Sequence, residues 1–378
     1  MTPEEVELLS ELTIVIPTYN RPLELERAIE YWRDIPVTVH ILDGSEKPWF
    51  PVGVLPSASK ITYHHFPSQN SSGPLENYLL RIKFGTELSK TKYSALCADD
   101  DVFLFNGLVD AIKVLESNDS LDSVIGQNSR YLKVHPDVLW FERGIVIHDS
   151  ERCNLEVSRR LLCVPEIANY YSNYYGIFKT QVWIQIFQTQ ASCKFKFPIS
   201  CEFLVHLLIS ILSRNFIIDS QLWVTNKATP GGTNLRQIGF GDWLNGRESR
   251  GEVKEFISIL SKSMSAIDPS LSIDNADKLI RLRLSLIKPN RQTFGQSFVL
   301  KTKKVILVCI SHLPKAVRFR LFRCLSDQLQ NRIGNDDFKI KSKSRNFLSD
   351  ELVNSTDFQK WEKILLMQRE ELRLRANI

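Results

Sequence analysis

The sequence lacks several patterns that would place the protein in a class at once. Its seven cysteines include no Cys-x-x-Cys pair and are odd in number. This argues against a structural zinc site and a disulfide framework, and it favours a reducing compartment. The first residues are acidic and have no apolar core of a signal peptide, and the apolar run at 203–212 is too short to span a bilayer. We therefore expect a cytoplasmic protein.

Two common nucleotide-binding motifs are missing as well. No Gly-x-Gly-x-x-Gly follows the first predicted strand, which argues against a dinucleotide-binding Rossmann domain. No Gly-x-x-x-x-Gly-Lys-[Ser/Thr] occurs, which argues against a P-loop NTPase. The chain of 378 residues is long enough for two domains and has an ordinary globular composition, with 43% hydrophobic and 24% charged residues. Its net charge of +5 is too small to indicate nucleic-acid binding.

What the chain does contain is an acidic triplet (Asp99, Asp100 and Asp101) directly after the short apolar segment 93–98. Adjacent like charges repel one another and are costly to desolvate, so a cation is expected beside them. Oxygen ligands at a strand end suit a hard divalent ion, Mn²⁺ or Mg²⁺, which also binds phosphates. The alternative is that the triplet caps the next helix, because Asp is favourable at helix N-termini.

The first part of the chain alternates between strand and helix patterns. Strands are predicted at 12–18, 37–42, 61–66 and 93–98, and helices at 23–32, 74–88 and 106–116. This alternation predicts a parallel sheet with helices on its faces, in which ligands lie beyond the carboxyl ends of the strands. Thr18, Asp43 and the acidic triplet fall at those ends, which favours a phosphate-bearing ligand such as a nucleotide, together with a metal.

Three motifs in this region resemble family 2, GT-A-type inverting glycosyltransferases. Residues 13–22 read Thr-Ile-Val-Ile-Pro-Thr-Tyr-Asn-Arg-Pro, like the first strand and turn of that family. Asp43 matches its second-strand Asp, and the acidic triplet matches its DxD motif. The likeness is good over 12–115 and loose over 116–245. It implies an α/β GT-A (Rossmann-like) fold with a mixed, mainly parallel sheet flanked by helices.

The resemblance also implies a hexosyltransferase-like activity in cell-surface polysaccharide synthesis. A sugar would pass from a nucleotide-diphosphate donor, such as a UDP-sugar, to a hydroxyl of a glycan or lipid-linked acceptor, with inversion. The catalytic domain would be 1–246. Residues 247–378, where the patterns are those of amphipathic helices, would form a mainly helical C-terminal domain.

Carried over to this chain, the family's donor site would be built from its strand ends. A divalent ion there would stabilise the negative charge that the leaving nucleoside diphosphate gains in the transition state. Two plainer readings stay open: Arg21 is a solvated side chain, and Thr18 is a helix cap. The implied residues are Pro17, Thr18 and Tyr19 lining the nucleotide, Arg21 near its phosphates or ribose, Asp43 at the base edge, Asp99 near ribose or sugar hydroxyls, Asp100 in the donor site, and Asp101 on the metal.

Glu202 is the candidate general base. It stands at the start of a strongly apolar helix, where partial desolvation would raise its pKa toward neutrality. The family places an acidic residue, often in a Glu-Asp pair, at this point to deprotonate the acceptor, whereas here the pair is Cys201-Glu202. His206, one turn later, would hold Glu202 or contact the acceptor. The alternative is that Glu202 only interacts favourably with the helix dipole.

Two further segments are candidate parts of the sugar and diphosphate sites. Tyr174 and Tyr175 belong to a tyrosine-rich segment that offers the ring faces and hydroxyls by which sugars are bound, although a core strand would show the same pattern. Asn234 and Arg236 lie in a Gly-rich loop that would close over the diphosphate, or would be an ordinary connection.

The C-terminal region carries a basic stretch at 339–345. An anionic membrane surface would attract such a cluster, which suits a lipid-linked acceptor and peripheral contact at the inner face of the membrane; the alternative is a solvated surface. Two rival functions remain: a nucleotidyltransferase, and a non-catalytic glycan- or partner-binding protein that keeps the fold. The first would need a basic Gly-rich loop after the first strand, which 18–22 do not form. The second is opposed by the intact acidic triplet and Glu202.

Overall fold

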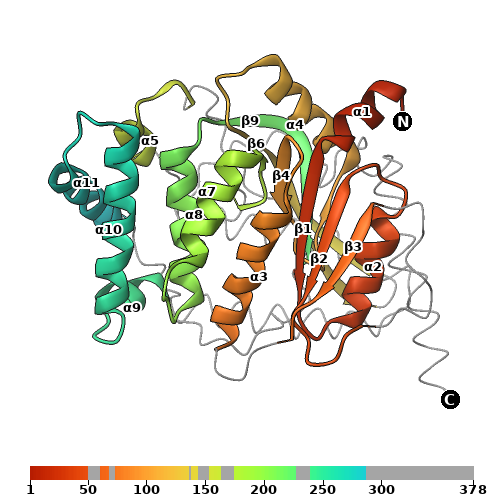
Figure 1. Ribbon diagram of the computed structural model, residues 1–378, viewed down its shortest axis with the longest axis horizontal. Helices are drawn as coiled ribbons and strands as arrows, with labels where there is room; N and C mark the ends of the chain where they lie inside the picture. Colours follow the sequence, from red (N-terminus) through yellow and green to blue (C-terminus); the bar gives the residue numbers. More distant parts are fainter. Residues whose placement is uncertain are drawn as a thin grey trace, which may run out of the picture.

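The computed structural model describes residues 1–49, 60–67, 73–135, 138–143, 153–162, 174–226 and 239–286. These residues form a nine-stranded sheet in the order β3-β2-β1-β4-β8-β6-β9-β5, with β7 paired to β6. The sheet has helices on both faces (Figure 1). The predicted mixed, mainly parallel sheet flanked by helices is confirmed. Asn234, Arg236 and the basic stretch at 339–345 lie outside the described residues.

The N-terminal half of the sheet is entirely parallel. β2 and β4 flank β1, and β3 follows β2 at the edge, with Thr18 beside Asp43 and Val15 beside Leu96. The carboxyl ends of these strands therefore meet at one edge of the sheet. The strands are β1 (Leu12–Thr18), β2 (Thr38–Asp43), β3 (Ile61–His65) and β4 (Tyr93–Leu96), and the helices between and around them are α1 (Pro3–Ser10), α2 (Pro22–Trp32), α3 (Pro74–Leu88) and α4 (Phe105–Ser117).

The other half of the sheet mixes strand directions. β8 is antiparallel to both of its neighbours, β4 and β6, while β6 and β9 are parallel to each other. β5 returns antiparallel to β9 directly after the acidic triplet, so Val102 pairs with Val224. The elements of this half are β5 (Val102–Phe103), β6 (Ser123–His135), β7 (Val138–Arg143), α5 (Val157–Leu162), β8 (Ile177–Lys179), α7 (Thr180–Ala191), α8 (Pro198–Leu212) and β9 (Asn215–Asn226).

β1 lies between β2 and β4, and its residues are buried on both faces of the sheet. Successive side chains of a strand point to opposite faces, and here neighbours in the chain join different hydrophobic clusters. Ile14 and Ile16 pack with α2 and α4, whereas Val15 packs with α3 and the helices beyond it. The continuous apolar run of β1, which a half-exposed strand could not carry, follows from this two-sided burial.

The last described helices continue the second of these clusters. α10 packs on α8, and its residues Leu260 and Met264 are fully buried in the cluster that contains α3, α7 and α8. The carboxylate of buried Glu252 accepts hydrogen bonds from the Trp243 indole (3.0 Å) and from the backbone N–H of Lys196. Figure 1 shows these helices at the end of the molecule away from β1, β2 and β3; they are α9 (Phe240–Asn245), α10 (Arg250–Ile267) and α11 (Ile273–Leu286).

Within the described ranges, no helix is both long and apolar enough to cross a bilayer.

Candidate functional site

The carboxyl ends of β1, β2 and β4 bring together the polar residues predicted to lie there. The Thr18 hydroxyl donates a hydrogen bond of 2.7 Å to Oδ2 of Asp99, joining the end of β1 to the acidic triplet. The backbone N–H of Gly44, just after β2, donates to the carbonyl of Thr18 at 3.0 Å. Thr18, Asp43 and Asp99 are all buried. The sheet edge thus holds a compact, charged cluster rather than three separate loops.

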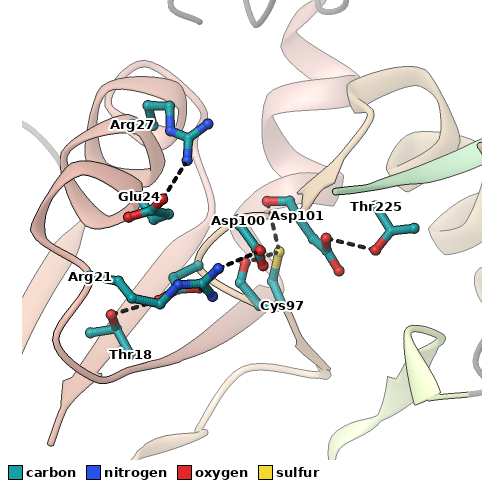
Figure 2. A network of polar contacts seen from close by, with 10 residues as sticks. Thr18, Arg21, Glu24, Arg27, Cys97, Asp100, Asp101 and Thr225 are labelled. Atoms are coloured by element: carbon teal, nitrogen blue, oxygen red, sulfur yellow. Dashed lines mark hydrogen bonds and ion pairs between the residues drawn. The ribbon is translucent and has the colours of Figure 1, made fainter. Parts of the chain in front are cut away.

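Arg21 is paired with two members of the acidic triplet at once. Its Nη1 lies 2.5 Å from Oδ1 of Asp99, and its Nη2 lies 2.6 Å from Oδ2 of Asp100 (Figure 2). The Arg21 and Asp100 side chains are 15% and 12% exposed, and that of Asp99 only 3%, so these ion pairs are shielded from bulk water. Charge-assisted hydrogen bonds of this length are the strong class. Arg21 is therefore a fixed part of the cluster, and the interpretation as a solvated side chain does not describe it.

The backbone explains how Arg21 reaches this place. Asn20 has a φ of 54°, in the left-handed region, and among the described residues other than glycine no second one has a positive φ. Asn tolerates this conformation better than most residues. Its backbone N–H donates to the Ser45 hydroxyl at 2.8 Å, which fixes the bend. α2 then begins at Pro22, whose fixed φ suits the first helical position, with Arg21 as its N-cap residue.

Asp99 has an altered acidity because it is buried. Burial raises the pKa of Asp99 to about 7; Arg21 acts in the opposite direction, and the neighbouring Asp100 raises the pKa further. The pKa of Arg21 is itself raised: burial works to lower it, but the interactions with Asp99 and Asp100 outweigh burial. Asp99 therefore titrates near neutrality, and Arg21 stabilises its charged form.

Asp101 is held differently from its two neighbours. Its Oδ1 accepts a hydrogen bond of 2.8 Å from the Thr225 hydroxyl on β9, and its backbone carbonyl accepts one from the Cys97 thiol at 3.6 Å (Figure 2). Burial raises the pKa of the Cys97 thiol well above its usual value, and the three carboxylates add to the effect. Cys97 therefore stays a neutral donor beneath the acidic triplet.

The donor chemistry of the acidic triplet bears on a divalent ion. Within the described part of the chain, no group of three or more His, Cys, Asp or Glu side chains converges as a metal site. Mg²⁺ in nucleotide sites is commonly held by only one or two carboxylates, with phosphates and waters supplying the other oxygens. Asp100 and Asp101 are oxygen ligands of the right kind, so the residues present fit such an ion when a ligand brings the remaining oxygens.

The carboxylate of Asp43 accepts three hydrogen bonds from within the chain. Its Oδ1 accepts from the backbone N–H of Ser45 at 2.9 Å and from the Ser45 hydroxyl at 2.5 Å, and its Oδ2 accepts from the Tyr63 hydroxyl at 2.6 Å. A carboxylate has about four acceptor positions, so these bonds leave about one for a ligand. In the free protein Asp43 mainly fixes the turn after β2.

Arg81 is a residue of this site that the sequence patterns did not point to. It lies on α3 and is buried (5% exposed), yet its Nε has no hydrogen-bond partner among the described residues. Its guanidinium rests against Gly44, where an added Cβ would lie 1.9 Å from Nη1, and its Cζ is 6.0 Å from the centre of the Tyr19 ring. Burial lowers the pKa of Arg81, while Tyr78, Asp43 and Tyr19 act to raise it. A buried cation with an unsatisfied N–H is costly unless an anion or acceptor joins it.

The structure places Glu202 next to a pair of tyrosine hydroxyls. Tyr78 on α3 and Tyr174 have their hydroxyl oxygens 3.1 Å apart. Burial raises the pKa of both, to about 12 for Tyr78, and Glu202 contributes to each rise as a nearby negative charge. Glu202 is half-buried in α8. Glu202 is therefore within electrostatic reach of Tyr78 and Tyr174.

Tyr175 is close to Tyr174 and interacts electrostatically with Asp100 and Asp101. Its ring lies 5.7 Å from that of Tyr174 and stacks on Trp223 at 4.1 Å. Burial raises the pKa of Tyr175 strongly, with Asp101 and Asp100 the next contributors, so its hydroxyl stays neutral beside them. His206, in contrast, is 1% exposed and lies against Phe203 within the core, 5.8 Å between ring centres. Pro17 is half-buried on β1.

Comparisons with known proteins add little to this geometry. No protein-family model matches the chain, and no curated protein does. A solved structure of TarS residues 1–349 from S. aureus matches over 71% of this chain and 90% of its own, with 12% sequence identity and a TM-score of 0.38. This match is too distant to assign a family or an activity.

Proposed function

We propose that the protein is a glycosyltransferase that moves a sugar from a nucleotide-diphosphate donor to a hydroxyl of a glycan or lipid-linked acceptor. The observation that carries this proposal is the meeting of Arg21, Arg81 and the acidic triplet at the carboxyl ends of parallel strands. Ligands of open α/β sheets bind at such an edge. The two guanidinium groups supply cationic donors for an anionic ligand, and the acidic triplet supplies oxygen ligands for an ion.

In this proposal the donor nucleotide lies along the ends of β1 and β2. Tyr19 and Arg81 flank the position next to Asp43, and Arg21 lies farther along, at the N-terminus of α2, where phosphates are stabilised by the helix dipole. Asp100 and Asp101 would hold a divalent ion, which when bound neutralises charge on the leaving diphosphate. UDP is the first donor nucleotide to test, on the family resemblance.

Glu202 is the proposed general base. It would take the proton from the acceptor hydroxyl as that oxygen attacks the anomeric carbon, while the bond from that carbon to the diphosphate breaks. A general base must be within reach of the proton and close to neutral pKa. The half-buried position of Glu202 in apolar α8, with its charge acting on the hydroxyls of Tyr78 and Tyr174, supports this role. Inversion follows if this displacement is direct.

Thermal-shift measurements test the proposal. The full chain is melted with UDP, GDP, CDP, CMP and TDP, each with and without Mn²⁺ or Mg²⁺. A ligand that binds only the folded state raises the melting temperature in proportion to its occupancy. The proposal expects a shift for one nucleotide, reduced in Arg81→Ala. If folded protein shifts with none of them, a binding protein without nucleotide chemistry replaces the transferase.

A further inference from the structure

Arg21 pairs with Asp99 and Asp100, the carboxylates beside which a divalent ion is expected. A guanidinium that binds two carboxylates already satisfies part of the oxygen set that a divalent ion would use. Two cations cannot share the same oxygens without strong repulsion. In the ligand-free chain, the guanidinium of Arg21 thus occupies the position beside the acidic triplet that a divalent cation would otherwise take.

We propose that Arg21 is an internal counter-ion that prevents divalent ions from binding to Asp99 and Asp100 until a diphosphate binds and pairs with the guanidinium. Ion and diphosphate would then load together rather than independently. The part that concerns the free chain needs only the ion pairs described above. The part that concerns the diphosphate rests on the proposed function.

Several features show that Arg21 is built into this position. The left-handed Asn20 and its hydrogen bond to Ser45 direct the chain over the acidic triplet, and Pro22 starts α2 directly afterwards. Thr18 binds the other oxygen of Asp99, so both oxygens of this carboxylate are occupied from within the chain. Glu24, the next acid along α2, is paired with Arg27 at 3.3 Å, so it does not compete strongly for Arg21 (Figure 2).

A diphosphate is the ligand that can release this arrangement. Arginine binds phosphate oxygens through two parallel hydrogen bonds, as it does carboxylates. The diphosphate would approach the N-terminus of α2, at which Arg21 stands, and would bring oxygens for the ion that Arg21 had excluded. Because binding free energies are reciprocal, the ion must then strengthen diphosphate binding by the same factor by which the diphosphate strengthens ion binding.

Electron paramagnetic resonance of Mn²⁺ tests the first part without any activity. The signal of free hydrated Mn²⁺ is titrated with the wild-type chain, Arg21→Met and the control Arg33→Met. Arg33 stands at the other end of α2 and is paired only with exposed Glu30 among the described residues. Met keeps much of the length of the side chain and removes the charge. We expect Arg21→Met to bind Mn²⁺ at least about tenfold more tightly than wild type, and Arg33→Met to equal wild type.

A second variant locates the new site. Adding Asp100→Asn to Arg21→Met should remove the gain in Mn²⁺ affinity, because one of the released carboxylates is gone. Equal Mn²⁺ affinity of wild type and Arg21→Met would overturn the proposal. A gain that survives Asp100→Asn would overturn it too, since the ion would then bind elsewhere. Circular dichroism and thermal melting establish that each variant is folded before the comparison is made.

UDP and GDP, added separately, test the coupling to a diphosphate. The affinity of wild type for Mn²⁺ should rise with the nucleotide that binds, and the rise should be smaller in Arg21→Met. A nucleotide that binds without metal and leaves the Mn²⁺ affinity of wild type unchanged would overturn coupled loading. If neither nucleotide, nor any other in the thermal-shift set, binds, the proposed function fails instead, while the metal-only titration still decides the role of Arg21.

Discussion

The guanidinium of Arg81 lies directly on the backbone of Gly44. A Cβ at this glycine would come within 1.9 Å of Nη1 and 2.3 Å of Cζ, closer than any side-chain contact allows. Gly44 follows the last residue of β2 and its N–H binds the carbonyl of Thr18, so the backbone has little freedom to move away. The small residue after Asp43 is therefore explained by space for Arg81 and not by an unusual backbone angle.

The first prediction concerns this contact. Gly44→Ala should push Arg81 out of its buried position and weaken nucleotide binding by about tenfold or more, since overpacking typically costs about 1–3 kcal/mol. Thermal shift and calorimetry with the nucleotide that binds wild type measure the effect. Gly73→Ala is the matched control, because an added Cβ there has no neighbour within 4 Å in the described part of the chain. In an Arg81→Ala background, Gly44→Ala should have little further effect on nucleotide binding. If it still caused its full loss of binding there, the effect of Gly44→Ala would not act through Arg81.

Asp101 gives a second prediction. Asp101→Ala should remove the metal-dependent part of donor binding, so that the affinity for UDP with Mn²⁺ falls to that measured without Mn²⁺, by roughly a hundredfold. Calorimetry with and without Mn²⁺ measures both values in one preparation. Asp277→Ala, which removes a half-buried carboxylate paired with exposed Arg281 on α11, serves as the control. Unchanged metal dependence in Asp101→Ala would remove this carboxylate from the ion site.

Much of the first half of the fold was predictable because its patterns are local. The predicted strand at 12–18 and the predicted helix at 74–88 agree with β1 and α3 residue for residue. β5 and β8 were not predicted, since strands of two and three residues are too short to show a period. β9 was missed because its sequence mixes polar and apolar residues without a strict alternation, and it is placed by pairing with β6.

The meeting of the strand ends with the acidic residues was predictable, but their contacts were not. Strand ends and acidic residues could be read from the chain, and they do meet at one edge. The ion pair of Arg21 with Asp99 joins residues 78 apart in the sequence, and no local pattern encodes it. The sequence did not predict that Arg81 belongs to this cluster, because an arginine in the middle of an amphipathic helix normally faces water. Only the packing of α3 against the turn after β2 buries it.

A third prediction tests the proposed base. Glu202→Gln keeps the shape of the side chain and removes its ability to accept a proton, so transfer should fall by roughly 10²–10⁴-fold while donor affinity stays within about twofold. Single-turnover transfer and calorimetry with the donor nucleotide give the two values. Glu87→Gln, at an exposed position near the end of α3, is the control. Transfer at the wild-type rate in Glu202→Gln would assign the proton to another group.

The last prediction concerns His40 and His64, which are neighbours on β2 and β3. Nδ1 of His40 lies 3.3 Å from Nε2 of His64, and both rings are half-buried. Burial lowers the pKa of His40 to about 4 from 6.5, and His64 lowers it further; burial also lowers the pKa of His64. The two imidazole rings face each other across the β2–β3 pair, and Phe84 of α3 packs against His64.

The direction of the pH effect follows from these shifts. Between about pH 6.5 and pH 4 the unfolded chain binds a proton at His40 that the folded chain does not, so the contribution of His40 to the free energy of unfolding should fall as pH is lowered through this range, while Asp99, with its raised pKa, acts in the opposite direction. Allowing for the partial exposure of the ring, the loss from His40 should be roughly 1–2 kcal/mol. Urea unfolding at pH 7.5 and pH 5.0 measures it. His40→Phe should reduce the difference between the two pH values, whereas Thr62→Val, at the exposed position paired with His40, should leave it unchanged. An equal difference in wild type and His40→Phe would show that other groups set the acid sensitivity.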